Sequence, residues 1–321
     1  MRAFLVTLIV VLLTGFLLQA PFDRLKENDL LGEAGALQAN SIAAKKARVE
    51  EIFNSVSLEA KGVIVQEYPS GNVLFARDEH ALFPLASVAK LMTALTAQEA
   101  EQNKPSPFPL VVPITEGAVR QEGDSGFLAG ETFYVEDLID IMLANSSNDA
   151  AFAIAGFSGD IFAGQDLTEK DSVEVFIQRM NIKKNGLGLF DLQFSNVTGL
   201  DIDEENNVSG AYGSPAHVAG LVALLLRDYP FMLERTQQDV LVVSSSDSVH
   251  SFENTNYLAS SIPGLRASKT GYTELAGGNL AVAIDIGFGR TVIIVVLASS
   301  FDGRFSDIER LYNATLEYYR E

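Results

Sequence analysis

The pattern of apolar and polar positions predicts strands near both ends of a globular region. Apolar runs at residues 63–65 and 72–76, separated by a turn that contains proline and glycine, indicate two adjacent strands. Two longer apolar runs, at 279–286 and 291–298, flank a glycine-rich turn and predict an antiparallel hairpin. The strand signal is therefore concentrated at the beginning and the end of this region.

Helical periodicity dominates the block between these strands, from about residue 101 to 235. It is clearest at 135–143, at 173–184 and at 215–226, where Ser-Pro opens the helix. A last amphipathic helix is predicted at 305–319. We therefore expect an α/β (α+β) fold in which N- and C-terminal strands close one sheet, helices pack on it, and the helical block forms the second wall of a cleft.

The first 58 residues differ in composition from the rest of the chain. Residues 1–20 contain the uncharged stretch 3–18, which is typical of either a cleaved signal peptide or a short uncleaved membrane anchor. Residues 21–58 are polar and alanine-rich, with a predicted helix at about 43–53, and we interpret them as a stalk or linker. In both interpretations the globular region, 59–321, lies outside the cytoplasm in the cell envelope, anchored or secreted.

Charge and composition exclude several classes of function. The formal net charge of −19 argues against binding to nucleic acid or to anionic lipid by electrostatic attraction. The chain has no cysteine, and His80, His217 and His250 show no metal-ligand spacing, so we expect no metal and no cofactor. We expect these histidines to make surface or satisfied polar contacts, and a Ser-His-Asp hydrolase is disfavoured.

A serine and a lysine near a predicted helix start carry the strongest chemical signal. Ser87 precedes Lys90 by three residues, which places the hydroxyl and the amine on one helix face, where the amine can take the hydroxyl proton. Two further motifs follow in order, Ser146-Ser147-Asn148 and Lys269-Thr270-Gly271. Taken singly, the second motif reads as a helix cap and the third as a strand end. Together the three motifs predict a serine nucleophile activated by lysine.

From about residue 60 to 321 the chain resembles the low-molecular-mass penicillin-binding proteins, in particular the D-alanyl-D-alanine carboxypeptidase and endopeptidase group. The other matching stretches are Gly130-Glu131, Val135-Glu136-Asp137-Leu138, Asn148-Asp149-Ala150-Ala151, Ser195-Asn196, Gly199-Leu200-Asp201, Ala298-Ser299-Ser300 and Gly303-Arg304-Phe305. The resemblance implies the serine β-lactamase-like fold, an antiparallel sheet flanked by helices with an inserted helical subdomain.

The resemblance also implies a role for each motif residue. Ser87 would attack the carbonyl between two D-alanines, with Lys90 as base, to give an acyl-enzyme that water hydrolyses. Ser146 would relay a proton to the leaving amine, and Asn148 would hydrogen-bond the substrate amide. Ser147 stands where glycine or aspartate is more usual, and we expect it to point away from the chemistry.

The third motif and an arginine would bind the end of the substrate. Lys269 would attract the terminal carboxylate and help lower the pKa of Lys90, and Thr270 would hydrogen-bond that carboxylate. Gly271 would allow close approach of the backbone, and the backbone N–H groups of Ser87 and Tyr272 would form the oxyanion hole. Arg304 matches a carboxylate-binding arginine of some carboxypeptidases in the family.

The resemblance thus implies a serine-type D-alanyl-D-alanine carboxypeptidase that trims the terminal D-alanine of peptidoglycan stem peptides. Such an enzyme acts in peptidoglycan biosynthesis and affects the cell wall and cell shape. The expected partners are stem peptides ending in D-Ala-D-Ala, β-lactams as covalent inhibitors, and a membrane through residues 3–20 if this segment is uncleaved. A D,D-endopeptidase acting on cross-links stays an alternative. A class A β-lactamase is less favoured because no Glu-x-x-Leu-Asn stretch lies between Asn148 and Lys269. A non-enzymatic β-lactam receptor is also less favoured, because we expect no cytoplasmic output domain before residue 3.

Overall fold

The computed structural model describes residues 45, 47–104, 106–287 and 289–320. Its contacts divide the chain into two units, residues 1–54 and 55–321, each of which is described by itself. In the first unit, residues 45 and 47–54 are helical, which agrees with the helix predicted at about 43–53. The predicted signal or anchor and most of the predicted stalk lie outside the described residues.

The second unit is built on a five-stranded antiparallel sheet with the strand order β12-β13-β14-β1-β2. The strands are β1 (Gly62–Tyr68), β2 (Val73–Arg77), β12 (Leu265–Thr273), β13 (Gly277–Asp285) and β14 (Thr291–Ser299). This confirms that strands from both ends of the region form one sheet. Strands β13 and β14 are buried along almost their whole length because helices cover both faces of the sheet.

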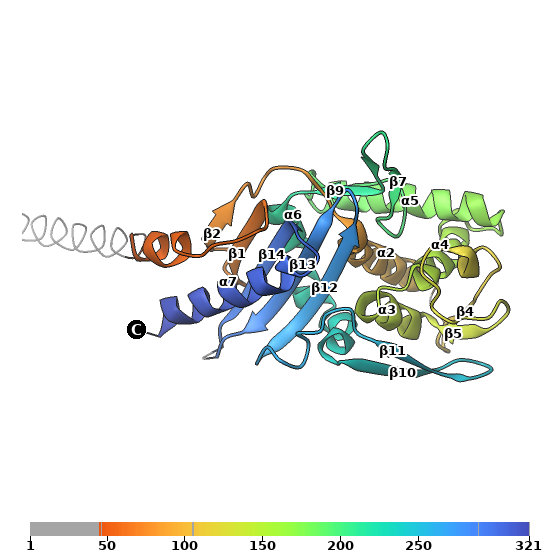
Figure 1. Ribbon diagram of the computed structural model, residues 1–321. Helices are drawn as coiled ribbons and strands as arrows, with labels where there is room; N and C mark the ends of the chain where they lie inside the picture. Colours follow the sequence, from red (N-terminus) through yellow and green to blue (C-terminus); the bar gives the residue numbers. More distant parts are fainter. Residues whose placement is uncertain (1–44, 46, 105, 288, 321) are drawn as a thin grey trace, which may run out of the picture. The chain divides into compact units, whose positions relative to one another are not determined.

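Helices α6 (Pro215–Asp228) and α7 (Gly303–Tyr319) provide this cover on opposite faces of the sheet (Figure 1). The buried Asp307 of α7 accepts hydrogen bonds from the backbone N–H groups of Glu59 (3.1 Å) and Ala60 (2.8 Å) and from the hydroxyl of Ser299 (2.8 Å). A charged acceptor with three donors is a strong local clamp. It fixes the start of β1 beside the end of β14.

The helical block lies beside β12, the strand at one edge of the sheet (Figure 1). Its helices are α2 (Lys90–Asn103), α3 (Val135–Ala144), α4 (Asn148–Ala163) and α5 (Glu169–Gly186). Side-chain oxygens of Ser147, Thr168 and Ser214 accept the first-turn N–H groups of α4, α5 and α6, which explains where these helices begin. The predicted helices at 135–143, 173–184, 215–226 and 305–319 are confirmed.

Several short elements were not predicted from the sequence. They are β3 (Phe83–Pro84), η1 (Ala86–Ala89), β4 (Val111–Pro113), η2 (Ala118–Arg120), β5 (Thr132–Tyr134), β6 (Gln193–Phe194), β7 (Asp201–Asp203), β8 (Val208–Ser209), β9 (Ala211–Gly213), η3 (Pro230–Gln237), β10 (Val240–Ser244) and β11 (Val249–Glu253). Strands of two or three residues are too short to show a repeat of period two. Consequently the block from about 101 to 235 is less purely helical than expected.

No single helix among the described residues is long and apolar enough to cross a membrane. Helices α6 and η3 pass that test of length and composition only as a pair, and they are bent by 106° relative to each other.

Candidate active site

Ser87 and Lys90 meet at the junction between η1 and α2. Ser87 lies in the 3₁₀ turn and Lys90 is the first residue of α2, so the three-residue spacing places both side chains on one side of the chain. Lys90 Nζ lies 2.8 Å from Ser87 Oγ. Lys90 is fully buried, and this burial lowers its pKa from 10.5 to about 7. Above this pH the amine is mainly neutral and can accept the proton of the hydroxyl beside it.

Two more acceptors surround the Lys90 amine. Asn148 Oδ1 lies 2.6 Å from Nζ, and the backbone carbonyl of Thr198 lies 3.1 Å away. Asn148 opens α4, whose first turn is capped by the buried Ser147. The Ser147 hydroxyl is 2.6 Å from that of Ser125, so it is engaged with the loop before α3. The structure thus brings the first two motifs together through Lys90 and Asn148.

Ser146 occupies the bend between α3 and α4. Its φ of 69° lies in the left-handed region, which side-chain-bearing residues adopt rarely and which is common at functional sites. Its hydroxyl makes no hydrogen bond to the residues that the structure describes. It is therefore available for a proton relay, two residues from Asn148.

The loop between η2 and β5 makes hydrogen bonds to Asn148 and to the residue after it. The Asn148 amide donates a hydrogen bond to the backbone carbonyl of Glu122 (2.6 Å), and Asp149 Oδ2 accepts one from the backbone N–H of Ser125 (3.2 Å). Asp149 is buried, and this burial is the main reason why its pKa is raised. The Asn148 amide nitrogen carries a second hydrogen, which could be donated to a substrate while the bond to Glu122 is kept.

Strand β12 carries the third motif past the Ser87 turn. A Cβ atom on Gly271 would lie 2.9 Å from the carbonyl oxygen of Leu85 and 3.1 Å from the backbone nitrogen of Ser87. Only glycine allows β12 to pass this close to the nucleophile without displacing backbone. The next residue, Tyr272, is partly exposed beside this approach.

Lys269 is a second buried amine in the site. Its Nζ donates to the backbone carbonyl of Thr270 (3.0 Å), and only 1% of the residue is exposed. Burial lowers the pKa of Lys269 well below its usual value, and repulsion by Lys90 and Arg304 adds to the effect. The predicted repulsion between the two lysines thus acts on the pKa of Lys269, whereas burial accounts for the lowered pKa of Lys90.

Arg304 approaches the same strand from the start of α7. Its Nη1 donates to the backbone carbonyl of Gly271 (2.8 Å), and its guanidinium lies over the rings of Phe301 (4.5 Å) and Phe305 (4.7 Å). Only 5% of Arg304 is exposed, its Nε has no partner, and no carboxylate among the described residues forms an ion pair with it. Burial lowers its pKa. A buried cation that lacks a counter-ion favours an anionic ligand.

Sequence reasoning missed the contribution of one loop. It named Ser195-Asn196 as one of the stretches that match the family, yet the turn formed there places the Thr198 carbonyl on Lys90. Asn196 Oδ1 accepts hydrogen bonds from the backbone N–H groups of Thr198 (3.3 Å) and Gly199 (2.7 Å), and Gly199 has a φ of 82°. An asparagine followed three residues later by a glycine is a recognisable turn signal, but it does not reveal which carbonyl the turn presents.

Two of the three histidines make their contacts away from Ser87, Lys90 and Asn148. His217 contacts Asp191 (2.6 Å) and His250 contacts Glu131 (2.6 Å), so both make paired polar contacts. Hydrogen bonds from Ser245 and His250 lower the pKa of Glu131 to about 2 against the opposing effect of its burial. Within the described ranges no group of three or more histidine, aspartate or glutamate side chains is placed to hold a metal.

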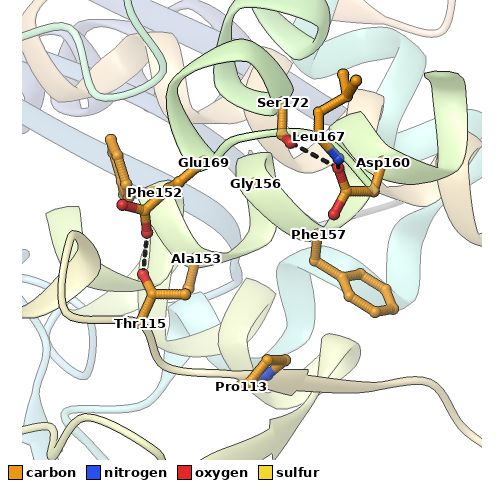
Figure 2. Close-up of a pocket in the computed structure, with 10 residues that line it drawn as sticks. All are labelled: Pro113, Thr115, Phe152, Ala153, Gly156, Phe157, Asp160, Leu167, Glu169 and Ser172. Carbon is orange, nitrogen blue, oxygen red and sulfur yellow. Dashed lines mark hydrogen bonds between the residues drawn. The ribbon is translucent and has the colours of Figure 1, made fainter. Parts of the chain in front are cut away.

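A cavity of about 220 Å³ is lined by residues of α4, α5 and the segment that follows β4. Figure 2 shows these lining residues. Its polar side chains already pair with each other: Thr115 with Glu169, and Ser172 with Asp160 (2.6 Å). Its other walls are mainly apolar, including Phe152. None of the predicted site residues lines it, so the candidate chemistry lies at the Ser87 cluster.

The sheet, the helical wall and the three assembled motifs define the class: this is a protein of the penicillin-binding type. A family model described as D-alanyl-D-alanine carboxypeptidase matches residues 46–300. The chain therefore belongs to the D-alanyl-D-alanine carboxypeptidase family, which confirms the resemblance found in the sequence.

Two curated relatives illustrate the range of this similarity. A D-alanyl-D-alanine carboxypeptidase of Bacillus subtilis is 29% identical over 81% of this chain and 63% of its own length. The chain thus spans less than two thirds of that relative. A D-alanyl-D-alanine endopeptidase of Pseudomonas aeruginosa is 26% identical over 79% of this chain and 76% of its own length.

Solved structures confirm the fold. Penicillin-binding protein D2 of Listeria monocytogenes, solved in an ampicillin-bound form, is 28% identical, with a TM-score of 0.64 over 81% of this chain and 98% of its own. The Streptomyces K15 DD-transpeptidase has a TM-score of 0.70 at 22% identity, covering 82% of this chain and 98% of its own.

Proposed function

We propose that this protein is a serine-type D-alanyl-D-alanine carboxypeptidase that removes the terminal D-alanine from peptidoglycan stem peptides through an acyl-enzyme on Ser87. The observation that carries the proposal is the 2.8 Å contact between Ser87 Oγ and the buried amine of Lys90, whose pKa is lowered to about 7. The family membership supports the substrate class.

In the proposed acylation step, neutral Lys90 takes the proton of Ser87 while Oγ attacks the carbonyl carbon of the penultimate D-alanine. The peptide C–N bond breaks, and the leaving amine receives the proton held by Lys90 through Ser146, so that Lys90 is neutral again. Water then attacks the ester, and the proton it gives up returns to Ser87 as the acid product forms. Hydrogen bonds from the Ser87 and Tyr272 N–H groups would stabilise the negative oxygen in both steps.

The carboxylate of the leaving D-alanine would bind at the positive end of the site. Lys269 is buried on β12 and Arg304 is buried beside this strand, and Arg304 has no acidic partner among the described residues. A substrate carboxylate would supply the missing counter-ion, which favours peptides with a free C-terminus. In a chain of net charge −19, this local positive site must hold an anion against a repulsive background.

Replacing Arg304 by alanine should weaken the use of such peptides by about 1.5–3 kcal/mol, the range for a hydrogen bond to a charged group. The same change should matter much less for a peptide with an amidated C-terminus, because that peptide has no negative end. The measurement is kcat/KM for the acid and amide forms with wild type and Arg304→Ala, treated as a double-mutant cycle. A coupling energy of zero would place Arg304 outside the site.

A D,D-endopeptidase is the second candidate, because relatives at 26% identity are named as endopeptidases. The experiment that separates the two activities is incubation with purified, cross-linked muropeptides followed by mass analysis of the products. Loss of terminal D-alanine from uncross-linked stems supports the carboxypeptidase. Conversion of dimers to monomers with their termini intact supports the endopeptidase instead.

We also propose that β-lactams acylate Ser87 and that the globular region works in the cell envelope, in peptidoglycan biosynthesis. The ampicillin-bound form of the Listeria relative supports the first part. The uncharged stretch at residues 3–18 supports export or anchoring.

An uncleaved anchor predicts a mature protein that begins at or near Met1 and stays with membranes in high salt. The checks are N-terminal sequencing and salt extraction of membranes. An N-terminus mapped just after Ala20 would show that the protein is secreted.

A further inference from the structure

A threonine from outside the three motifs bridges the two walls of the site. Thr255 follows β11 and is exposed, and its Oγ1 lies 2.5 Å from Oγ1 of Thr270, the middle residue of the third motif. On its other side, Thr255 Oγ1 lies 3.1 Å from the backbone carbonyl of Ala144, two residues before Ser146. This one hydroxyl therefore touches both the substrate-binding strand β12 and the helix that leads into the second motif.

The local sequence fixes this threonine without the help of its own side chain. Asn254 donates from Nδ2 to the carbonyls of Thr236 (3.0 Å) and Gln238 (2.8 Å), and its Oδ1 accepts the backbone N–H of Asn256 (2.8 Å). In addition, the backbone N–H of Thr255 donates to the Ala144 carbonyl (3.0 Å). The backbone at Thr255 is thus held on both sides by hydrogen bonds that do not involve the Thr255 hydroxyl.

The number of hydrogens in this chain of hydroxyls limits its possible arrangements. Each threonine hydroxyl has a single hydrogen to donate. When Thr255 donates to the Ala144 carbonyl, Thr270 donates to Thr255 and has no hydrogen left for a ligand. When Thr255 donates to Thr270, the Thr270 hydrogen is free to point at an anion. The Ala144 carbonyl keeps its bond from the Thr255 N–H in both arrangements, so the change leaves no acceptor unpaired.

We propose that Thr255 is a positioning residue of the carboxylate site, which turns the Thr270 hydroxyl into a donor towards the substrate carboxylate. This inference rests on the proposed function, because it assigns the carboxylate to Thr270. Thr270 is only 3% exposed, and Thr255 is its side-chain partner among the described residues, so the direction of the Thr270 hydrogen depends on Thr255. A donated bond from Thr255 also polarises the Thr270 hydroxyl and strengthens its bond to an anion.

The test compares wild type with Thr255→Val, which removes the hydroxyl, and Thr255→Ser, which keeps it. The substrates are one N-acylated peptide ending in D-Ala-D-Ala and its C-terminal amide. Thr255→Val should lower kcat/KM for the acid roughly three- to tenfold, the effect of one hydrogen bond, and change the amide less than about twofold. Thr255→Ser should restore the acid value. Because Thr255 is exposed and its backbone is held independently, these variants should fold like wild type.

The matched control is Thr315→Val, which removes a buried hydroxyl bound only to a carbonyl of its own helix, α7 (2.7 Å to Leu311). It should leave the ratio of acid to amide unchanged. Equal losses for acid and amide in Thr255→Val, unchanged values in that variant, or no rescue by serine would each overturn the inference.

A second readout separates this inference from the proposed function. If wild type cleaves neither peptide, the carboxypeptidase proposal fails, and Thr255 is tested by the acylation rates with benzylpenicillin and its methyl ester. A selective loss for the free acid in Thr255→Val supports the role of Thr255. Equal rates in wild type and variant overturn it.

Discussion

Replacing Ser87 by alanine should abolish covalent labelling by a fluorescent penicillin, reducing the acylation rate by more than about 10³-fold. The hydroxyl beside Lys90 is the atom that would carry the acyl group, and alanine removes it while leaving the backbone N–H in place. The measurement is the amount of label on denatured protein after timed incubation.

The matched control for this experiment is Ser70→Ala, in the exposed turn between β1 and β2. It should label like wild type. Both variants should also unfold at temperatures close to that of wild type, since neither change leaves a large cavity. Labelling of Ser87→Ala at the wild-type level would sink the assignment of the nucleophile.

The second large effect concerns the base. Replacing Lys90 by arginine should slow acylation by at least about 10²-fold, because a guanidinium stays protonated and cannot accept the serine proton. In wild type, the pKa of about 7 means that Lys90 is protonated below this pH and neutral above it. The wild-type acylation rate should therefore rise with pH through a limb centred near 7, and the variant should lack that limb.

Stopped-flow acylation between pH 5 and 9 measures this profile, and the exposed Lys61→Arg is the control. Since arginine is larger than lysine in a fully buried position, the wild-type profile provides a test that needs no variant. A wild-type rate that is independent of pH across this range would contradict the role of Lys90 as base. Normal acylation by Lys90→Arg would contradict it as well.

The sequence predicted the sheet best where its strands are covered on both faces. Strands β13 and β14 are almost entirely buried, so they appear as continuous apolar runs, and their observed ends lie within two residues of the predicted ones. No prediction was made for β10, where Val240 and Val242 lie on the exposed face. With valine on both faces, the alternation that marks a half-buried strand is absent.

In the candidate site, contacts between side chains could be predicted from the sequence, whereas contacts made by backbone carbonyls could not. The predicted contact of Ser87 with Lys90 depends on side-chain types at a fixed spacing, and the structure contains it at 2.8 Å. The carbonyls of Thr198 and Glu122, which bind Lys90 and Asn148, could not be predicted because every residue has a carbonyl. Only the fold decides which carbonyls reach the site. Thr255 was missed for a related reason, since an isolated threonine has no distinguishing spacing.

The pairing of β1 with β14 affects when the sheet can form during synthesis of the chain. Gly62 pairs with Leu297, so β1, the first strand of this sheet along the chain, lies beside β14, the last one. Non-local pairing of this kind folds slowly, and although β1 can pair with β2 and β12 with β13 earlier, the two halves of the sheet cannot join until β14 has been synthesised. The complete sheet of a nascent chain therefore forms only late in synthesis. A protein that lacked β14 would lose the strand that joins β13 to β1, so the sheet that carries the site on β12 would be incomplete.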